Sequence, residues 1–228
     1  MMYAWAQRAD TTAFDEPIYA HYLRVTGRAH PGDDEVLAAQ DNDGEAVIRD
    51  VMLADYDTPI VFFKQMAKHL HGIDQATVSD VFYGQCRNVL LTRDPFDMLT
   101  SFQVNVPDTT VADTGFRELV DILDNSLAQG DEPIVLDSKL LLKNPKAVLR
   151  ELCRRLNVAF DPAMLSWPPG PKPEDGVWSV HWYDRVHASS GWAPWQPKQA
   201  TLLPHLQPVL DEVEPLYQRL QPYCITTD

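Results

Sequence analysis

The stretch with the clearest chemical potential is NVLLTRDPFDMLTS, residues 88–101. Arg93 follows a short apolar run there, and Ser101 lies two helical turns further on. A guanidinium offers a planar fork of N–H donors that fits the oxygens of a phosphate, and a serine hydroxyl adds one more donor. The spacing therefore suits the binding of an anionic group. An ordinary strand–helix turn, in which Arg93 pairs with a surface carboxylate, is the alternative.

The elements around Arg93 are expected to hold it at the end of a strand. Residues 89–91 form a short β-favouring run, typical of a strand that is buried on both faces of a parallel sheet. Asp94 and Pro95 predict a helix start, because Asp caps free N–H groups and Pro suits the first helical position. The inward face of that helix is expected to carry Phe96, Leu99 and Phe102. Ligands of open α/β sheets lie outside the carboxyl ends of the strands, where Arg93 falls.

Composition and charge limit the kinds of partner. The 228 residues are 45% hydrophobic and 23% charged, which is ordinary for a globular protein. The net charge of −14 repels nucleic-acid backbones, so we expect no nucleic-acid partner. Three widely spaced cysteines suggest neither a zinc site nor a disulfide framework and fit a reducing cytoplasm. No apolar run approaches the roughly 20 residues of a membrane span, and no signal region is evident.

The order of the predicted elements indicates the fold class. Strands are predicted at residues 11–14, 59–63, 89–91 and 134–136, and each is followed by helical patterning. This alternation predicts a three-layer α/β fold with a mostly parallel sheet, in one domain over residues 1–228. A loop rich in Trp and Pro at 166–195 and a final helix at 202–220 complete the chain.

Two segments resemble the sulfotransferase family. Arg-Asp-Pro followed by Asp97 and Ser101 resembles the segment that holds the 3′-phosphate of 3′-phosphoadenosine 5′-phosphosulfate (PAPS), so the resemblance assigns Arg93 and Ser101 to that phosphate. The string DSKLLLKNPKAVLRELCRRLNVAFDPAML resembles a second family segment, with Asp137 where most members have Glu. The resemblance implies a P-loop-type sulfotransferase fold and transfer of a sulfuryl group from PAPS to a hydroxyl or amine of a small acceptor, without a metal.

The junction after residues 59–63 is the predicted catalytic position. Sulfotransferases often place a Lys here, which stabilises charge on the bridging oxygen, and a His, which removes the acceptor's proton. Lys64 matches the first by position, whereas Met66 stands where many cytosolic members have the His. His69 is the nearest imidazole, and histidine can act as a base near neutral pH. A surface histidine beside Lys68 and His71 is the alternative for His69.

Acceptor-binding residues are predicted at two further places. DEPIYAHYL resembles a bacterial branch of small sulfotransferase-like proteins, in which Glu16 would sit near the ligand cleft; a helix-capping loop carboxylate is the alternative. Five of the six tryptophans fall within 166–195, where HWYDRVHASSGW resembles the same branch. Trp182 and Arg185 are predicted to bind the acceptor there. The alternative is that these rings only fix a long loop to the body of the protein.

The beginning of the sequence departs from the family pattern. In the family, a strand and a phosphate-cradling loop precede the helix that leads into DEPIYAHYL. Residues 1–8, MMYAWAQR, read as the back half of that helix, without a capping residue before them. We therefore expect the N-terminal strand and its loop to be missing, and transfer by this chain to be weak or absent. A kinase-like phosphotransferase that uses ATP, and a non-catalytic nucleotide- or protein-binding paralogue, are the two rival functions.

Overall fold

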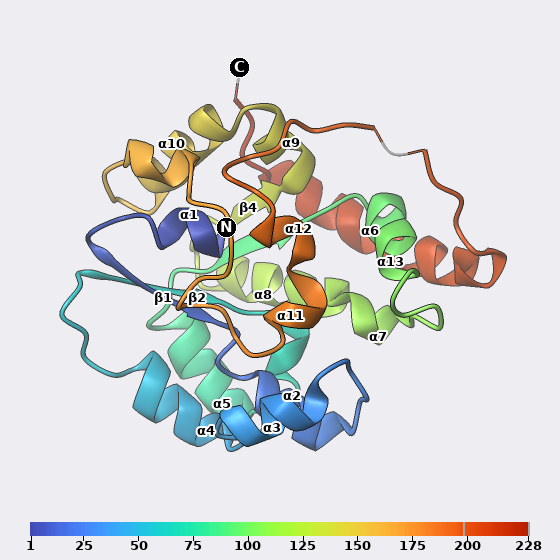
Figure 1. Cartoon of the computed structure of the whole chain (residues 1–228), viewed down its shortest axis with the longest axis horizontal. Coiled ribbons are helices and arrows are strands. Elements are labelled where there is room, and N and C mark those ends of the chain that lie inside the picture. Colours follow the sequence, from blue (N-terminus) through green and yellow to red (C-terminus); the bar gives the residue numbers. More distant parts are fainter. Residues whose placement is uncertain (198, 228) are drawn as a thin grey trace. The chain divides into compact units, whose positions relative to one another are not determined.

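The computed structural model describes residues 1–197 and 199–227. Within them each pair of hydrogen-bonded strands is parallel, and helices separate consecutive strands along the chain (Figure 1). The predicted α/β class is therefore confirmed. The residues group into two compact units, which are described in turn. That residues 1–228 form a single domain stays a prediction.

The first unit combines two stretches of chain, Met1–Val78 and Asp161–Ala193. Its α-helices are short, with no more than eight residues each. The α-helices are α1 (Met2–Trp5), α2 (Tyr19–Thr26), α3 (Asp33–Ala39), α4 (Gly44–Val47), α5 (Gln75–Thr77), α11 (Ser179–Trp182) and α12 (Asp184–His187). A π-helix, η1 (Ile48–Met52), and two 3₁₀-helices, η2 (Ala67–Leu70) and η4 (Pro162–Leu165), accompany them.

The sheet of the first unit consists of β1 (Thr11–Asp15) and β2 (Ile60–Lys64). Their register sets Asp15 opposite Lys64, so an acidic and a basic side chain meet at the carboxyl edge of the sheet. Aromatic residues of α2 pack together with Trp178, which comes from the second stretch of chain in this unit. The buried cluster consists of Tyr19, Ala20, Tyr22, Leu23, Val36 and Trp178.

The second unit begins at Ser79, runs to Phe160 and resumes at Pro194. Its α-helices are α6 (Pro95–Phe102), α7 (Val111–Thr114), α8 (Phe116–Ala128), α9 (Ser138–Lys143), α10 (Pro145–Arg155) and α13 (Gln207–Leu220). The 3₁₀-helices are η5 (Pro204–Leu206) and η6 (Gln221–Tyr223), and the π-helix η3 (Val78–Tyr83) spans the boundary of the two units in sequence. Asn144 caps α10 by accepting a hydrogen bond from Ala147 N, as Asn-Pro at a helix start predicts.

The sheet of the second unit consists of β3 (Val89–Thr92) and β4 (Ile134–Asp137). All residues of β4 are buried. The prediction that residues 89–91 are buried on both faces is wrong, because Leu91 is 47% exposed. Successive residues of a strand point to opposite faces, and only the face that carries Leu90 and Thr92 is covered.

The helix after β3 begins as predicted. The Asp94 carboxylate accepts a hydrogen bond from Asp97 N, and Pro95 is the first residue of α6. The inward face is only partly as expected, since Leu99 is fully buried while Phe96 is 37% exposed. The buried residues of this helix are Pro95, Leu99 and Thr100, and Phe96 lies off the face that they form. Among the described residues, no helix is long and apolar enough to cross a membrane.

A buried hydrogen bond links α13 to the end of β4. The Tyr217 hydroxyl donates to Asp137 Oδ2 at 2.9 Å, while Asp137 Oδ1 accepts from Lys139 N and Leu140 N at the start of α9. We expect Tyr217→Phe to lower the free energy of unfolding by about 1.5–3 kcal/mol, because the hydrogen bond has a charged acceptor and both partners are buried. Urea unfolding followed by circular dichroism measures this change.

Tyr223→Phe is the matched control for that prediction. Its hydroxyl lies 3.3 Å from the guanidinium of Arg219 in an exposed hydrogen bond, so its loss should change stability by less than about 0.5 kcal/mol. Equal stabilities of the two variants would show that Tyr217 and Asp137 do not stabilise this unit through their hydrogen bond.

Candidate active site

The turn after β1 brings two carboxylates to the carboxyl edge of the first sheet. Asp15 ends the strand, and Glu16 follows with a φ of 43°, a left-handed conformation that few residues with a side chain adopt. The turn is fixed from both sides. Glu16 N donates to Lys64 O at 2.7 Å, and the Gln40 side-chain amide donates to Glu16 O at 3.2 Å. The backbone therefore holds the Glu16 carboxylate beside the end of β2.

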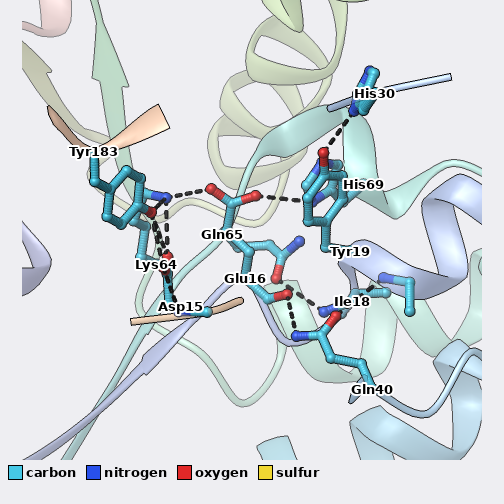
Figure 2. Close-up of polar contacts among 12 residues, drawn as sticks. Asp15, Glu16, Ile18, Tyr19, His30, Gln40, Lys64, Gln65, His69 and Tyr183 are labelled. Carbon is cyan, nitrogen blue, oxygen red and sulfur yellow. Dashed lines mark hydrogen bonds and ion pairs between the residues drawn. The ribbon is translucent and has the colours of Figure 1, made fainter. Parts of the chain in front are cut away.

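Lys64 is the centre of the polar contacts at this edge (Figure 2). Its ammonium donates to Asp15 Oδ1 at 3.0 Å, to Glu16 Oε1, and to the Tyr183 hydroxyl at 2.6 Å. Lys64, predicted to be catalytic, and Glu16, predicted separately to bind the acceptor, are thus brought together. The segments that end β1 and β2 and the segment after α11 each supply part of the group.

The burial of these groups sets their electrostatics. The side chains of Asp15, Glu16 and Lys64 are 0%, 9% and 30% exposed. Burial lowers the pKa of Lys64, but the Glu16 and Asp15 carboxylates raise it more, so the net shift is upward. Burial, with the charge of Asp15, raises the pKa of Glu16 despite the neighbouring Lys64. One ammonium does not fully compensate two buried carboxylates, and the raised pKa of Glu16 reflects this.

His69, the predicted base, lies on η2 with its side chain 1% exposed. Its ring stacks on Tyr19 with centroids 4.7 Å apart and packs against Tyr22 at 4.8 Å. Its Nδ1 lies 3.7 Å from Glu16 Oε2 and has no hydrogen-bond partner among the described residues. Burial, with the charges of Lys68 and Lys64, holds the pKa of His69 well below its usual range. The imidazole is therefore neutral near pH 7, and its role as the base stays a prediction.

The segment rich in Trp is partly packed into the first unit. Trp178 is 2% exposed, and Trp182 packs against the buried cluster of α2. Arg185 is exposed on α12. The packing of Trp178 fits the expectation that aromatic rings fix this loop, while acceptor binding by Trp182 and Arg185 stays a prediction.

The predicted phosphate-binding residues lie in the second unit. Arg93 comes directly after β3, and Ser101 lies near the end of α6. Arg93 is half-buried, and among residues 1–197 and 199–227 its guanidinium makes no hydrogen bond or ion pair. It is therefore not the partner of a surface carboxylate, which was the alternative explanation for it.

Sequence reasoning missed two members of the group around Lys64. Asp15 was passed over beside Glu16, although a carboxylate at the end of a parallel strand was a signal for it. Tyr183 lies between the two predicted residues Trp182 and Arg185, yet nothing in the spacing connects it with Lys64. Within the part of the chain that the structure describes, no group of three or more His, Cys, Asp or Glu side chains is placed to hold a metal ion.

Comparison with known proteins decides the family. A family model described as a sulfotransferase domain matches residues 1–221. The chain belongs to the sulfotransferase family. This agrees with the resemblance of the segments around Arg93 and Asp137, and it makes the transfer of a sulfonate-type group the general chemistry of the fold.

The relatives of this sulfotransferase domain include much longer proteins. Branched-chain-amino-acid aminotransferase-like proteins 2 and 1 of Arabidopsis thaliana are 34% and 35% identical to it over 223 residues, which is 97% of this chain. The chain spans only 39% of the length of either relative. A solved structure, the sulfotransferase domain from the Synechococcus PCC 7002 olefin synthase, is 14% identical, with a TM-score of 0.38 over 91% of this chain and 94% of that one.

Proposed function

We propose that this sulfotransferase domain uses PAPS as its donor and transfers the sulfuryl group to a hydroxyl or amine of a small acceptor. The family supports the type of reaction. Arg93 directly follows β3 at the carboxyl end of its sheet, where ligands of α/β folds bind, and this supports an anionic donor. The acceptor is proposed to be a small molecule rather than a nucleic acid or a membrane, because the net charge is −14.

The proposed reaction is an in-line displacement at sulfur. The acceptor oxygen or nitrogen forms a bond to sulfur while the bond from sulfur to the bridging phosphate oxygen breaks. Adenosine 3′,5′-bisphosphate leaves with the electron pair, and the acceptor proton passes to a base, for which His69 is the proposed residue. Lys64 would stabilise the negative charge that develops on the bridging oxygen. Positioning and charge stabilisation carry most of such a reaction.

One observation carries the proposal of a PAPS-type donor. Arg93 is half-buried at the end of β3, and within the described residues its guanidinium has no anionic partner. A guanidinium that is partly removed from water is costly unless it is paired, so a bound anion is the natural partner. The 3′-phosphate of PAPS meets that need, whereas ATP has no phosphate at the 3′ position.

The test is calorimetric titration of the protein with adenosine 3′,5′-bisphosphate and, separately, with ATP. We expect the bisphosphate to bind more tightly. Arg93→Ala should weaken its binding by about 1.5–3 kcal/mol, because a charge-assisted hydrogen bond is lost. A transfer assay with PAPS and a panel of small hydroxyl and amine compounds then identifies the acceptor.

Arg154→Ala is the matched control, because Arg154 is exposed on α10 and paired with Glu151. It should leave the affinity for the bisphosphate unchanged. Tighter binding of ATP would favour a kinase-like phosphotransferase. Binding of neither nucleotide would favour a non-catalytic paralogue.

The compartment is part of the proposal. Cys86, Cys153 and Cys224 are not joined in disulfides, and two of them are buried. Free thiols persist in a reducing compartment, which supports a cytoplasmic location.

A further inference from the structure

All three N–H donors of the Lys64 ammonium are in use. They point to Asp15 Oδ1, Glu16 Oε1 and the Tyr183 hydroxyl. A lysine ammonium has three donors and no acceptor, so the third partner completes its shell. Two of these partners come from the turn at the end of β1 and stay with the sheet. The third comes from the junction of α11 and α12, more than a hundred residues later in the sequence.

Asp15 holds Tyr183 in this place. The Tyr183 hydroxyl lies 2.9 Å from Asp15 Oδ1 and 2.8 Å from Oδ2, and it donates its proton to this carboxylate. Its oxygen is then free to accept from Lys64, which is the arrangement that Figure 2 shows. Gly176 N also donates to Asp15 Oδ2, at 3.2 Å. A fully buried carboxylate therefore fixes both the ammonium and the segment that carries Tyr183.

The segment is held by a second set of contacts behind Tyr183. Asp175 Oδ2 lies 3.0 Å from His187 Nε2 and accepts a hydrogen bond from the Tyr3 hydroxyl at 2.8 Å. The rings of Tyr183 and His187 meet edge to face with centroids 6.0 Å apart. Because of these contacts, the Tyr183 ring cannot move away from Lys64 unless the whole segment moves with it.

We propose that Tyr183 is a positioning residue for Lys64, whose hydroxyl fixes the ammonium at the carboxyl edge of the β1–β2 sheet. With only Asp15 and Glu16 as partners, the flexible side chain of Lys64 can pivot between two carboxylates. A third acceptor, out of line with the first two, defines a single position. This inference rests on the proposed function, in which the Lys64 ammonium stabilises the leaving oxygen.

The proposal has a kinetic consequence. A displacement of about 1 Å in a group that stabilises the transition state can cost up to about 100-fold in rate. Tyr183→Phe keeps the ring and removes only the hydroxyl. We expect its turnover with PAPS to fall by about tenfold or more, while its affinity for adenosine 3′,5′-bisphosphate changes by less than about twofold. If the Tyr183 hydroxyl had a purely structural role, its loss would lower stability but would not lower turnover while leaving the affinity unchanged.

Tyr56→Phe is the matched control for this experiment. Its hydroxyl donates to Val51 O at 2.7 Å in the same unit, to a backbone carbonyl rather than to the group around Lys64, so this variant also loses a tyrosine hydroxyl and its hydrogen bond. We expect unchanged turnover for Tyr56→Phe. If Tyr183→Phe loses no more turnover than Tyr56→Phe, the proposal is wrong.

A second measurement does not depend on sulfuryl transfer. In protein labelled with ¹⁵N at the lysine amino groups, NMR reports how fast each ammonium exchanges its protons with water, and Lys64→Arg identifies the Lys64 signal. We expect exchange at Lys64 to be about tenfold faster or more in Tyr183→Phe than in the wild type and in Tyr56→Phe, since one hydrogen bond is lost. Unchanged exchange overturns the inference. If the wild type transfers no sulfuryl group, the proposed function is wrong. The exchange measurement then still shows whether the Tyr183 hydroxyl fixes the Lys64 ammonium.

Discussion

Lys64→Gln should lower the free energy of unfolding by about 3 kcal/mol at pH 7, because it leaves two buried carboxylates without a cation. The loss should shrink as the pH falls. The pKa of Glu16 is already raised by burial and by Asp15, and removing Lys64 takes away the charge that lowers it. A raised pKa means that the folded state binds a proton more readily than the unfolded state. The variant therefore regains stability as the pH falls through that pKa and loses stability as the pH rises through it.

Urea unfolding at pH 7 and at pH 5 measures both parts of this result. Lys146→Gln removes an exposed lysine from α10 and should change stability by less than about 0.5 kcal/mol at either pH. Turnover of Lys64→Gln should also fall by about 100-fold or more, if Lys64 stabilises the leaving oxygen. A loss of stability that is the same at both pH values would contradict the assignment of the uncompensated charge to Asp15 and Glu16.

His69→Phe should lower turnover by about 100-fold or more, which is the usual loss on removing a general base. Phenylalanine keeps a ring between Tyr19 and Tyr22, so the variant removes the nitrogens with little loss of packing. Protonation of His69 should not lower the turnover of the wild type when the pH falls from 7 to 6. The pKa of His69 lies well below its usual range, so its neutral form persists over that interval.

His71→Phe is the control, because His71 is exposed and its side chain is only two residues away in sequence. Its turnover should equal that of the wild type. If His69→Phe keeps full turnover while Glu16→Gln loses it, the base is Glu16, whose carboxylate lies between Lys64 and His69.

Local signals in the sequence predicted the elements well. The β-favouring runs at 11–14, 59–63, 89–91 and 134–136 are β1, β2, β3 and β4, each within a residue or two. Asp94-Pro95 and Asn144-Pro145 both mark helix starts, because capping and the fixed φ of proline act within one turn. Exposure was harder to predict, as Leu91 shows, because it depends on what covers a face rather than on the residue itself.

The candidate site could be predicted only in part. Both Lys64 and Glu16 were predicted near the carboxyl ends of strands, and they meet because β1 and β2 pair in parallel with Asp15 opposite Lys64. Tyr183 lies 168 residues after Asp15, and no periodicity connects the two. Its place depends on how the segment after α11 folds back, and Trp178 and Asp175 settle that through packing and hydrogen bonds. Contacts of that kind need three-dimensional information.

The left-handed backbone of Glu16 has a consequence for how this position can evolve. A side chain in that conformation costs roughly 1–2 kcal/mol, and glycine would remove the cost. Glycine would also remove one of two carboxylates that share a single ammonium. Selection for thermal stability alone should therefore drive residue 16 toward glycine, whereas selection for a working Lys64–His69 neighbourhood should keep the acid. The residue found here in a sampled or evolved population then reports which of the two pressures has acted.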